Sequence, residues 1–192
     1  MLKKIEKEID KAAKAVASTA KLRENIGSAV NTIAGRIMMG GKLVIFGNGG
    51  SAADAQHVAA EFVGRFEKER RPFPAIALTV DSSILTAIGN DYGFDKIFSR
   101  QVEALVGSND VVIAISTSGN SENILKAVKK AGEKGAKIIG FTGKSGGKLG
   151  ALVDILINVN AKETCHVQEG HLVVLHVICK FVEEILYENK KT

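Results

Sequence analysis

The stretch KLVIFGNGGSA, residues 42–52, decides the fold class of this chain. Residues 42–47 form a short apolar run without polar alternation, which is typical of a strand buried on both faces of a sheet. The glycine-rich turn that follows leads directly into a helical pattern that extends to about Phe66. A buried strand, a tight turn and a helix open a βαβ unit, so this stretch predicts a parallel sheet covered by helices.

Working outward from residue 42, the same alternation recurs along the chain. Further apolar runs of strand length are separated by helical or glycine-rich segments, and this order predicts an α/β fold. We expect a three-layer sandwich, in which a five-stranded parallel sheet lies between helices. The predicted strands are 42–47, 75–79, 110–116, 136–143 and 154–159, and later helices are expected over 97–106, 121–134 and about 165–189.

A helical segment precedes the first strand. Apolar side chains spaced by three and four residues between residue 2 and about residue 38 predict one or two amphipathic helices, which end at Gly40 and Gly41. This segment takes no part in the alternation, so its apolar stripe is expected to pack against the sheet domain or another subunit. We treat residues 1–192 as a single domain, with residues 1–40 used in packing or oligomerisation.

The composition restricts the functional class. The chain has 192 residues, enough for one real core, and 45% of them are apolar. A nucleic-acid-binding protein usually gathers Lys and Arg on one surface with aromatic residues between them, but Trp is absent and aromatic residues make up only 5%. We therefore expect no nucleic-acid partner. The formal net charge of +5 suits an anionic metabolite.

The sequence also indicates a location. Cys165 and Cys179 form no CxxC pair and suggest no disulfide framework. The N-terminus has lysines but no apolar core of a signal peptide, and no apolar run is long enough to span a membrane. We expect a cytoplasmic protein without a membrane partner.

The segment ISTSGNSENI, residues 115–124, carries the strongest signal for a ligand. A buried strand ends there, Gly119 permits a tight turn, and a helix is expected to begin near Ser121. Free backbone N–H groups at a helix start, together with short hydroxyl side chains, make a phosphate cradle that needs no basic residue. A plain N-cap would explain only one of the hydroxyls. The hydroxyl side chains are Ser116, Thr117, Ser118 and Ser121.

The turn GNGGSA, residues 47–52, has two interpretations. It satisfies the G-x-G-x-x-A pattern of a dinucleotide-binding turn, which also requires an acidic residue after the second strand. Asp81 is the only candidate there, and it comes late. Alternatively, a glycine-rich turn lets a sugar approach the backbone closely. In the loop expected over residues 89–95, Asn90 and Asp91 are either ordinary turn residues or ligands of sugar hydroxyls.

Two predicted helices carry ionisable or polar groups at helical spacing. His57 and Glu61 are four residues apart in DAQHVAAEF (54–62), and Gln168 and His176 are two turns apart in the last helix. A lone histidine in an apolar helix is more often a satisfied core residue, but four such groups form a plausible cluster if the helices meet. Imidazole and carboxylate groups are normal zinc ligands, whereas a Gln oxygen is unusual and favours a substrate-facing or weak metal site.

These segments together resemble the sugar isomerase (SIS) domain family, and within it the phosphoheptose isomerases. The match covers residues 42 to about 185, and the helical N-terminus is of the kind that this family has. The segments occur in order as GNGGSAADAQHVAAEFVGRF, GNDYGF, ISTSGNSENI, TGKSGGK and VQEGHLVVLH.

The resemblance implies a function and an assembly. Such enzymes have a five-stranded parallel sheet between helices and form homotetramers with sites at subunit interfaces. They convert sedoheptulose 7-phosphate to D-glycero-D-manno-heptose 7-phosphate, the first step toward nucleotide-activated heptose for lipopolysaccharide or surface glycans. The reaction passes through an enediol, so it needs a base for a carbon proton and a nearby acid for the oxygens, but no organic cofactor.

The resemblance also implies residue roles. Glu61 is expected to be the base and His176 the acid. Zinc is expected at His57, Glu61, Gln168 and His176, which leaves a tension, because Glu61 cannot easily be a tight metal ligand and a free base at once. The phosphate is expected at Ser116, Thr117, Ser118 and Ser121, and the sugar at Asn48, Gly49, Gly50, Ser51, Asn90, Asp91 and Gln168.

One departure and two rival functions accompany the resemblance. The family commonly has Arg-Ile just before the position of Gln168, whereas this chain has His166 and Val167, preceded by Cys165. Part of the substrate mouth is therefore expected to differ, and Cys165 and His166 could together add metal affinity. One branch of the family lacks the Glu, replaces the last-helix His and binds the bacterial replication initiator; both residues are present here, which favours the enzyme. Sugar-phosphate-sensing regulators usually carry a DNA-binding domain, for which 192 residues leave no room.

Overall fold

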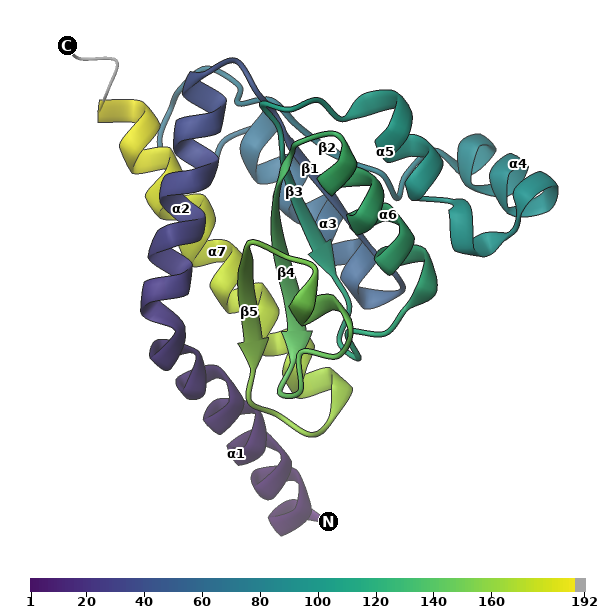
Figure 1. Cartoon of the computed structure of the whole chain (residues 1–192). Helices are drawn as coiled ribbons and strands as arrows, with labels where there is room; N and C mark the ends of the chain where they lie inside the picture. Colours follow the sequence, from purple (N-terminus) through teal and green to yellow (C-terminus); the bar gives the residue numbers. More distant parts are fainter. Residues whose placement is uncertain (189–192) are drawn as a thin grey trace.

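A computed structural model describes residues 1–188 and shows a single parallel sheet with helices on both sides (Figure 1). The strand order is β2–β1–β3–β4–β5, and every neighbouring pair is parallel. The predicted α/β class and the five-stranded parallel sheet are therefore confirmed. The strands are β1 (Leu43–Gly47), β2 (Ala75–Ala77), β3 (Val111–Ile115), β4 (Lys137–Gly143) and β5 (Ile155–Val159).

The central strands are apolar throughout because both of their faces are covered. In β1, Leu43 and Ile45 join one buried cluster, whereas Val44 and Phe46 join the cluster on the opposite face. The second strand differs from the prediction of a buried strand over 75–79. It has three residues at the edge of the sheet, and Ile76 is 36% exposed.

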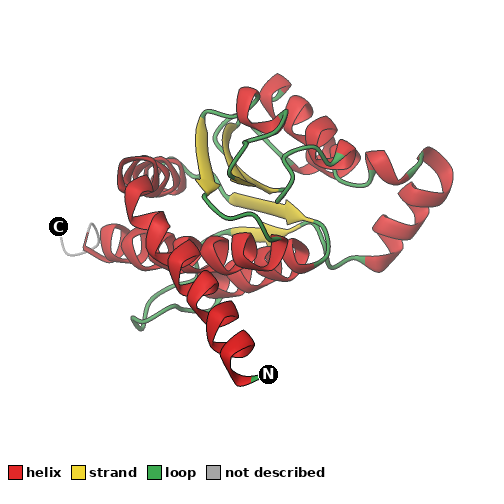
Figure 2. Cartoon of the chain, turned by 90° about the horizontal axis from the view of Figure 1, so that it is seen from below, coloured by secondary structure: helices red, strands yellow, loops and turns green. Residues whose placement is uncertain are grey.

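Helices form one layer on each face of the sheet, as Figure 2 shows. The cluster on one face joins the strands to α2, α3 and α7, and the other joins them to α5 and α6. The predicted last helix is confirmed as far as the description reaches, and residue 189 lies outside it. The helices are α2 (Arg23–Met38), α3 (Gly50–Val63), α5 (Ser99–Leu105), α6 (Glu122–Glu133) and α7 (Thr164–Glu188).

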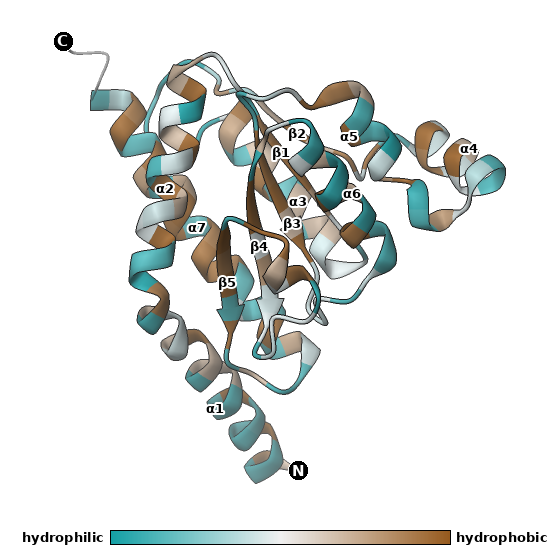
Figure 3. Cartoon of the chain, viewed as in Figure 1, coloured by the Kyte–Doolittle hydropathy of each residue, from teal (hydrophilic) through white to brown (hydrophobic). Residues whose placement is uncertain are grey.

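The N-terminal segment forms two helices, α1 (Leu2–Ser18) and α2, joined by a short 3₁₀ turn. The helix α2 buries its apolar face against the sheet domain, whereas α1 projects beyond it (Figures 1 and 3). Leu2, Ile5 and Ile9 of α1 are 79%, 49% and 63% exposed. The outer half of α1 therefore keeps an uncovered apolar stripe.

The segment after β2 corrects the prediction of a loop over 89–95. The helix α4 (Ser82–Tyr92) includes Asn90 and Asp91 in its last turn, and Gly93 ends it with a φ of 96°. Asp81, the candidate ribose ligand, caps this helix by accepting a 2.8 Å hydrogen bond from the backbone N–H of Ile84. The apolar residues of SSILTAIGNDY have helical spacing, whereas the glycines on either side of Asn90 and Asp91 predicted a loop.

A buried ion pair fixes the end of α3 to α7. The side chains of Arg70 and Glu183 are 3% and 2% exposed, and Arg70 Nε lies 2.8 Å from the Glu183 carboxylate. That carboxylate also accepts backbone N–H groups of residues 66–68, while the Arg70 guanidinium donates to the carbonyl groups of Glu61 and Phe62. The loop after α3 is thereby held against the last helix.

We expect Glu183→Gln to lower the free energy of unfolding by about 3–5 kcal/mol, because Arg70 would remain buried without its counter-charge. Burial raises the pKa of the Glu183 carboxyl, but the backbone N–H groups and Arg70 outweigh this and hold the pKa below its ordinary value of 4.5. The carboxylate therefore stabilises the fold above that value, and this contribution is lost as pH falls through the lowered pKa.

Urea denaturation between pH 7 and pH 3 measures both effects of Glu183→Gln. The matched control is Glu184→Gln, which removes a neighbouring carboxylate that makes no ion pair within the described chain. Equal stability of the two variants at pH 7 would contradict the assignment of the Arg70–Glu183 pair as the brace.

Candidate active site

A small cavity lies where the strand order reverses, between the carboxyl ends of β1 and β3. In doubly wound sheets this switch point is where ligands bind. The cavity has a volume of about 260 Å³ and brings together most of the residues that the sequence singled out for the phosphate and the sugar. Its lining consists of Asn48, Gly49, Gly50, Ser51, Ile115, Ser116, Thr117, Ser121, Thr164 and Gln168, and we call it the cradle.

Three helices begin at the cradle. Gly50 starts α3, Ser121 is the N-cap of α6, and Thr164 starts α7. The first turn of a helix leaves N–H groups without partners and carries a partial positive charge. No charged side chain lines the cavity, so these helix starts and the hydroxyl groups are the donors that it offers to an anion.

The loop after β3 has the tight geometry that its sequence predicted. The Ser116 hydroxyl donates to Ser121 Oγ over 3.1 Å, and the Ser118 hydroxyl accepts from the backbone N–H of Asn120. Gly119 has a φ of 66°, and a Cβ there would collide with the backbone of Gly146. A glycine is therefore required at this position. The loop after β4, which contains Gly146, packs against the loop that carries Gly119.

Two asparagines connect the loops on either side of the switch point. The Asn48 amide donates to Asn123 Oδ1 over 3.0 Å, and the Asn123 amide donates back to Asn48 Oδ1 over 2.9 Å. Asn123 is only 4% exposed. Sequence reasoning missed Asn123, because an asparagine in the first turn of a helix gives no sign of a partner 75 residues away.

A close approach between α3 and α7 explains another glycine. The side-chain amide of Gln168 lies directly over Gly50, where a Cβ would collide with it. Gly50 and Gln168 both line the cradle. The first turns of the two helices therefore meet at the cavity, and this contact fixes where the Gln168 side chain lies.

The ionisable cluster lies further along the same two helices. His57 Nε2 and His176 Nε2 are 2.8 Å apart, so one ring donates and the other accepts. Glu61 Oε1 is 3.7 Å from His57 Nε2. The side chains of His57 and Glu61 are 43% and 22% exposed, so the pair lies at the edge of α3 rather than in buried helix as expected.

The cradle and the ionisable cluster are separated within one chain. Glu61 lies about three turns, or roughly 16 Å, beyond Gly50 along α3. His176 lies about two turns beyond Gln168 along α7. The structure thus brings His57, Glu61 and His176 together, whereas Gln168 belongs to the cradle.

The donor types of the cluster fit zinc, because two imidazole nitrogens already face each other beside a carboxylate. Over residues 1–188, however, no three His, Cys, Asp or Glu side chains stand as a ready group for a metal ion. Glu61 faces His57 from a distance that is longer than a hydrogen bond. A metal would therefore have to replace the contact between His57 and His176.

Two further ionisable groups escaped sequence reasoning. Burial raises the pKa of Asp54, partly opposed by His57, and its Oδ2 is buried without a partner among the described residues. Burial lowers the pKa of His171 to about 4, although its hydrogen bond to the Thr142 carbonyl opposes this. His171 is therefore a neutral core residue whose Nε2–H donates over 2.9 Å.

Asn90 and Asp91 lie outside the cradle. Both are in the last turn of α4, and Asp91 lines a separate pocket with residues of α4 and α5. Figure 1 shows α4 at the margin of the molecule. Asn90 and Asp91 therefore cannot contact a sugar bound in the cradle of the same chain without a change in structure.

The strand order defines a doubly wound α/β protein, and its uncharged cavity at three helix starts is of the kind that can hold an anion. The SIS domain family model matches residues 6–143. The phosphoheptose isomerase of Aquifex aeolicus is 51% identical over 190 residues, which cover 98% of this chain and all of that relative. The chain belongs to the SIS domain family and, within it, to the phosphoheptose isomerases.

Solved structures agree with this assignment. A phosphoheptose isomerase from Francisella tularensis superposes with a TM-score of 0.92 at 38% identity, and that from Neisseria gonorrhoeae with a TM-score of 0.90 at 42% identity. Each alignment covers 95% of this chain and 98% of the other.

We expect Asn123→Ala to weaken binding of a sugar phosphate by about tenfold, since it leaves the Asn48 amide unpaired and frees one wall of the cradle. Calorimetric titration with a sugar monophosphate measures the change. Asn31→Ala, on the exposed face of α2, is the control and should bind as the wild type does. Unchanged affinity in Asn123→Ala would show that the asparagine pair does not shape the cradle.

Proposed function

We propose that this chain is an aldose–ketose isomerase that converts sedoheptulose 7-phosphate to D-glycero-D-manno-heptose 7-phosphate. One observation carries the proposal. This chain, which has an uncharged cradle, also presents Glu61 and His176 on the neighbouring helices α3 and α7, with His57 within contact distance of both. The product would enter nucleotide-activated heptose biosynthesis. A cytoplasmic location is part of the proposal, and no helix within residues 1–188 is long and apolar enough to cross a membrane.

The phosphate would bind in the cradle. Hydroxyl groups of Ser116, Thr117 and Ser121, together with the N–H groups at the start of α6, would hold its oxygens. Ser118, which lines the adjacent cavity rather than the cradle, is proposed as a further phosphate ligand. Asn48, Gly49, Gly50, Ser51 and Gln168 would contact the sugar, and Asn90 and Asp91 are proposed as further sugar ligands.

Glu61 and His176 would move the protons. The Glu61 carboxylate would remove the proton from the carbon next to the carbonyl group, and the enediol would form as His176 gives a proton to the carbonyl oxygen. Return of the proton from Glu61 to the neighbouring carbon, with loss of the proton of the other enediol hydroxyl to His176, gives the aldose and restores both residues. In the metal-free protein, the 2.8 Å contact between His57 and His176 would orient the acid, because each ring restrains the tautomer of the other. Zinc binding would replace this contact.

We also propose that this cluster binds one zinc ion per chain, held by His57, Glu61 and His176. Bound zinc would polarise an oxygen of the substrate. Gln168 is the fourth expected ligand, but its side chain lies over Gly50 about two turns from His176, so its part in the metal site stays a prediction. The chemistry of the donor set supports this proposal.

Zinc at 100 times its dissociation constant should stabilise the metal-stripped protein by about 2.7 kcal/mol, and His57→Ala should remove most of this gain. Thermal unfolding with and without zinc measures it, together with metal analysis after dialysis. The control is Glu133→Gln, which removes an exposed carboxylate of α6 outside the cluster. Equal zinc content in wild type and His57→Ala would contradict the proposed ligands.

We propose a homotetramer in which neighbouring subunits complete the sites. Two features support this. The cradle and Glu61 are about three turns apart along α3 of one chain. The outer half of α1 leaves Leu2, Ile5 and Ile9 exposed. A second copy could cover that stripe and bring its own cluster toward the cradle.

Glu61→Gln should keep binding of the sugar phosphate but lower turnover by at least about a thousandfold, because the amide cannot take the carbon proton. The assay follows sedoheptulose 7-phosphate in deuterated water by NMR, where the enediol route puts deuterium at C2 of the aldose. Glu133→Gln, on the exposed surface of α6, is the control. Full activity in Glu61→Gln would remove Glu61 from the role of base.

The same assay distinguishes the rival function and the assembly. Ketose that binds wild-type protein but stays unchanged would identify a sensor or partner-binding protein instead of an enzyme. At a substrate concentration too low to saturate Asn123→Ala, mixing its subunits with subunits of Glu61→Gln should give more activity than the two variants give apart if neighbouring chains share a site. No gain on mixing would place each site within one chain.

A further inference from the structure

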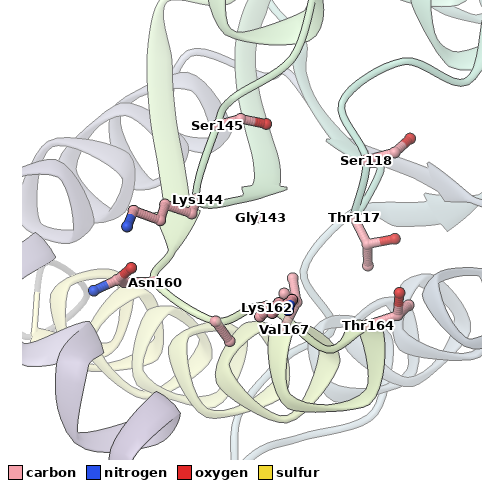
Figure 4. A pocket seen from close by; sticks show the side chains of 10 residues that line it. Thr117, Ser118, Gly143, Lys144, Ser145, Asn160, Lys162, Thr164 and Val167 are labelled. Atoms are coloured by element: carbon pink, nitrogen blue, oxygen red, sulfur yellow. The ribbon is translucent and has the colours of Figure 1, made fainter.

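A second and larger cavity lies beside the cradle, at the carboxyl ends of β3, β4 and β5. Its volume is about 750 Å³, and Thr117 and Thr164 line both cavities, so the two are adjacent. Figure 4 shows Thr117 and Ser118 on one side of it, and Lys144 and Asn160 on the opposite side. We call this cavity the lysine pocket, after Lys144 and Lys162 in its lining.

The charge of the lysine pocket is positive and is not neutralised. Its lining contains two lysines and no acidic residue. Within residues 1–188, neither Lys144 nor Lys162 makes an ion pair or a side-chain hydrogen bond. The nearest acid along the chain, Glu163, is paired with Lys11 of α1 at 3.2 Å. The pocket therefore differs from the cradle, which has no charged lining.

The pocket also offers neutral donors. The hydroxyl groups of Thr117, Ser145 and Thr164 line it and make no hydrogen bond with another described residue. Thr164 begins α7, a helix of 25 residues whose first N–H groups face this end of the sheet. Lys144 and Lys162 are exposed, and Figure 4 shows the Lys144 side chain extending away from Thr117 and Ser118, so a bound anion would draw its ammonium group inward. The lysines, the hydroxyl groups and the helix start together offer donors for a group with about two negative charges and three acceptor oxygens, which describes a phosphate monoester.

We propose that the lysine pocket is a second phosphate subsite, so that the protein binds ligands with two phosphate groups, one in the cradle and one in the pocket. The proposal rests on the proposed function, because the cradle must hold the first phosphate. The proposed substrate carries one phosphate and leaves the two lysines unmatched. A ligand with two phosphates therefore occupies the cradle in place of the substrate and acts as a competitive inhibitor.

Two classes of compound carry the required chemistry, namely sugar bisphosphates and nucleoside diphosphates. The shared feature is a pair of phosphate groups on one molecule, and the adjacent cavities supply no aromatic side chain for a base to stack on. A sugar bisphosphate therefore fits better, since its hydroxyl groups can contact Asn160 and the threonines between the two cavities.

The test is calorimetric binding of fructose 6-phosphate, fructose 1,6-bisphosphate and ADP to three full-length proteins. They are the wild type, the double variant Lys144→Gln/Lys162→Gln, and the control Lys21→Gln/Lys129→Gln, which removes the same charge from exposed positions outside both cavities. Each lysine–phosphate contact should contribute about tenfold in affinity. The wild type should thus prefer the bisphosphate over the monophosphate by up to about 100-fold.

The double variant should lose this preference and keep its affinity for the monophosphate, whereas the control should keep both. Equal affinity of wild type for the monophosphate and the bisphosphate would overturn the second subsite and leave the cradle intact. A preference that survives in the double variant would also overturn it, because another surface would then hold the second phosphate. Failure of both sugars to bind would overturn the second subsite, and titration of sedoheptulose 7-phosphate would then test the cradle and the proposed function separately.

Tighter binding of ADP than of the bisphosphate, lost in the double variant, would keep the subsite but assign it to nucleotides instead of sugars. An affinity for ADP that is the same in all three proteins would show that nucleotides do not use the lysine pocket. The choice between the two sources is therefore decided by the same titrations.

Discussion

The convergence of three helix starts on one small cavity is the constraint on which the rest of this structure depends. The helices α3, α6 and α7 can meet there only because the strand order reverses between β1 and β3. Gly50 leaves room for the Gln168 side chain between α3 and α7, and Gly119 permits close backbone approach of the loop before α6 to Gly146. The reciprocal Asn48–Asn123 pair then locks the two loops that face each other. The cradle is thus built from helix starts and short hydroxyl side chains, and the asparagine pair holds its walls in place.

The second organising feature is the rigid pair of α3 and α7. These two helices start at the cradle and carry His57, Glu61 and His176 two or three turns away from it. The buried pair of Arg70 and Glu183 closes the far end, because Arg70 also binds the carbonyl of Glu61. The position of the proposed base is therefore set by contacts at both ends of α3. The distance between Glu61 and the cradle supports the proposal that neighbouring subunits share a site.

The sheet could be predicted from the sequence because strands buried on both faces are continuously apolar, as in β1 and β3. The cradle residues could be predicted because their turns follow those strands directly. The short edge strand β2 and the helix through Asn90 could not, since exposure at an edge and the extent of a helix depend on neighbours that local patterns do not show. Asn123 and Glu183 were missed because their partners are distant in sequence. The roles of Glu61 and His176 rest on family resemblance, and the structure adds their proximity to His57.

The uncharged lining of the cradle has a consequence for how this protein can change over evolutionary time. A seat made of peptide groups cannot be removed by exchanging one charged residue, because no such residue holds it. Recognition of a phosphate can therefore persist while the residues around it drift toward other sugars, other partners or loss of catalysis. The chemistry of the neighbouring helices is then free to diverge on a scaffold that continues to bind the same charged end of its ligands.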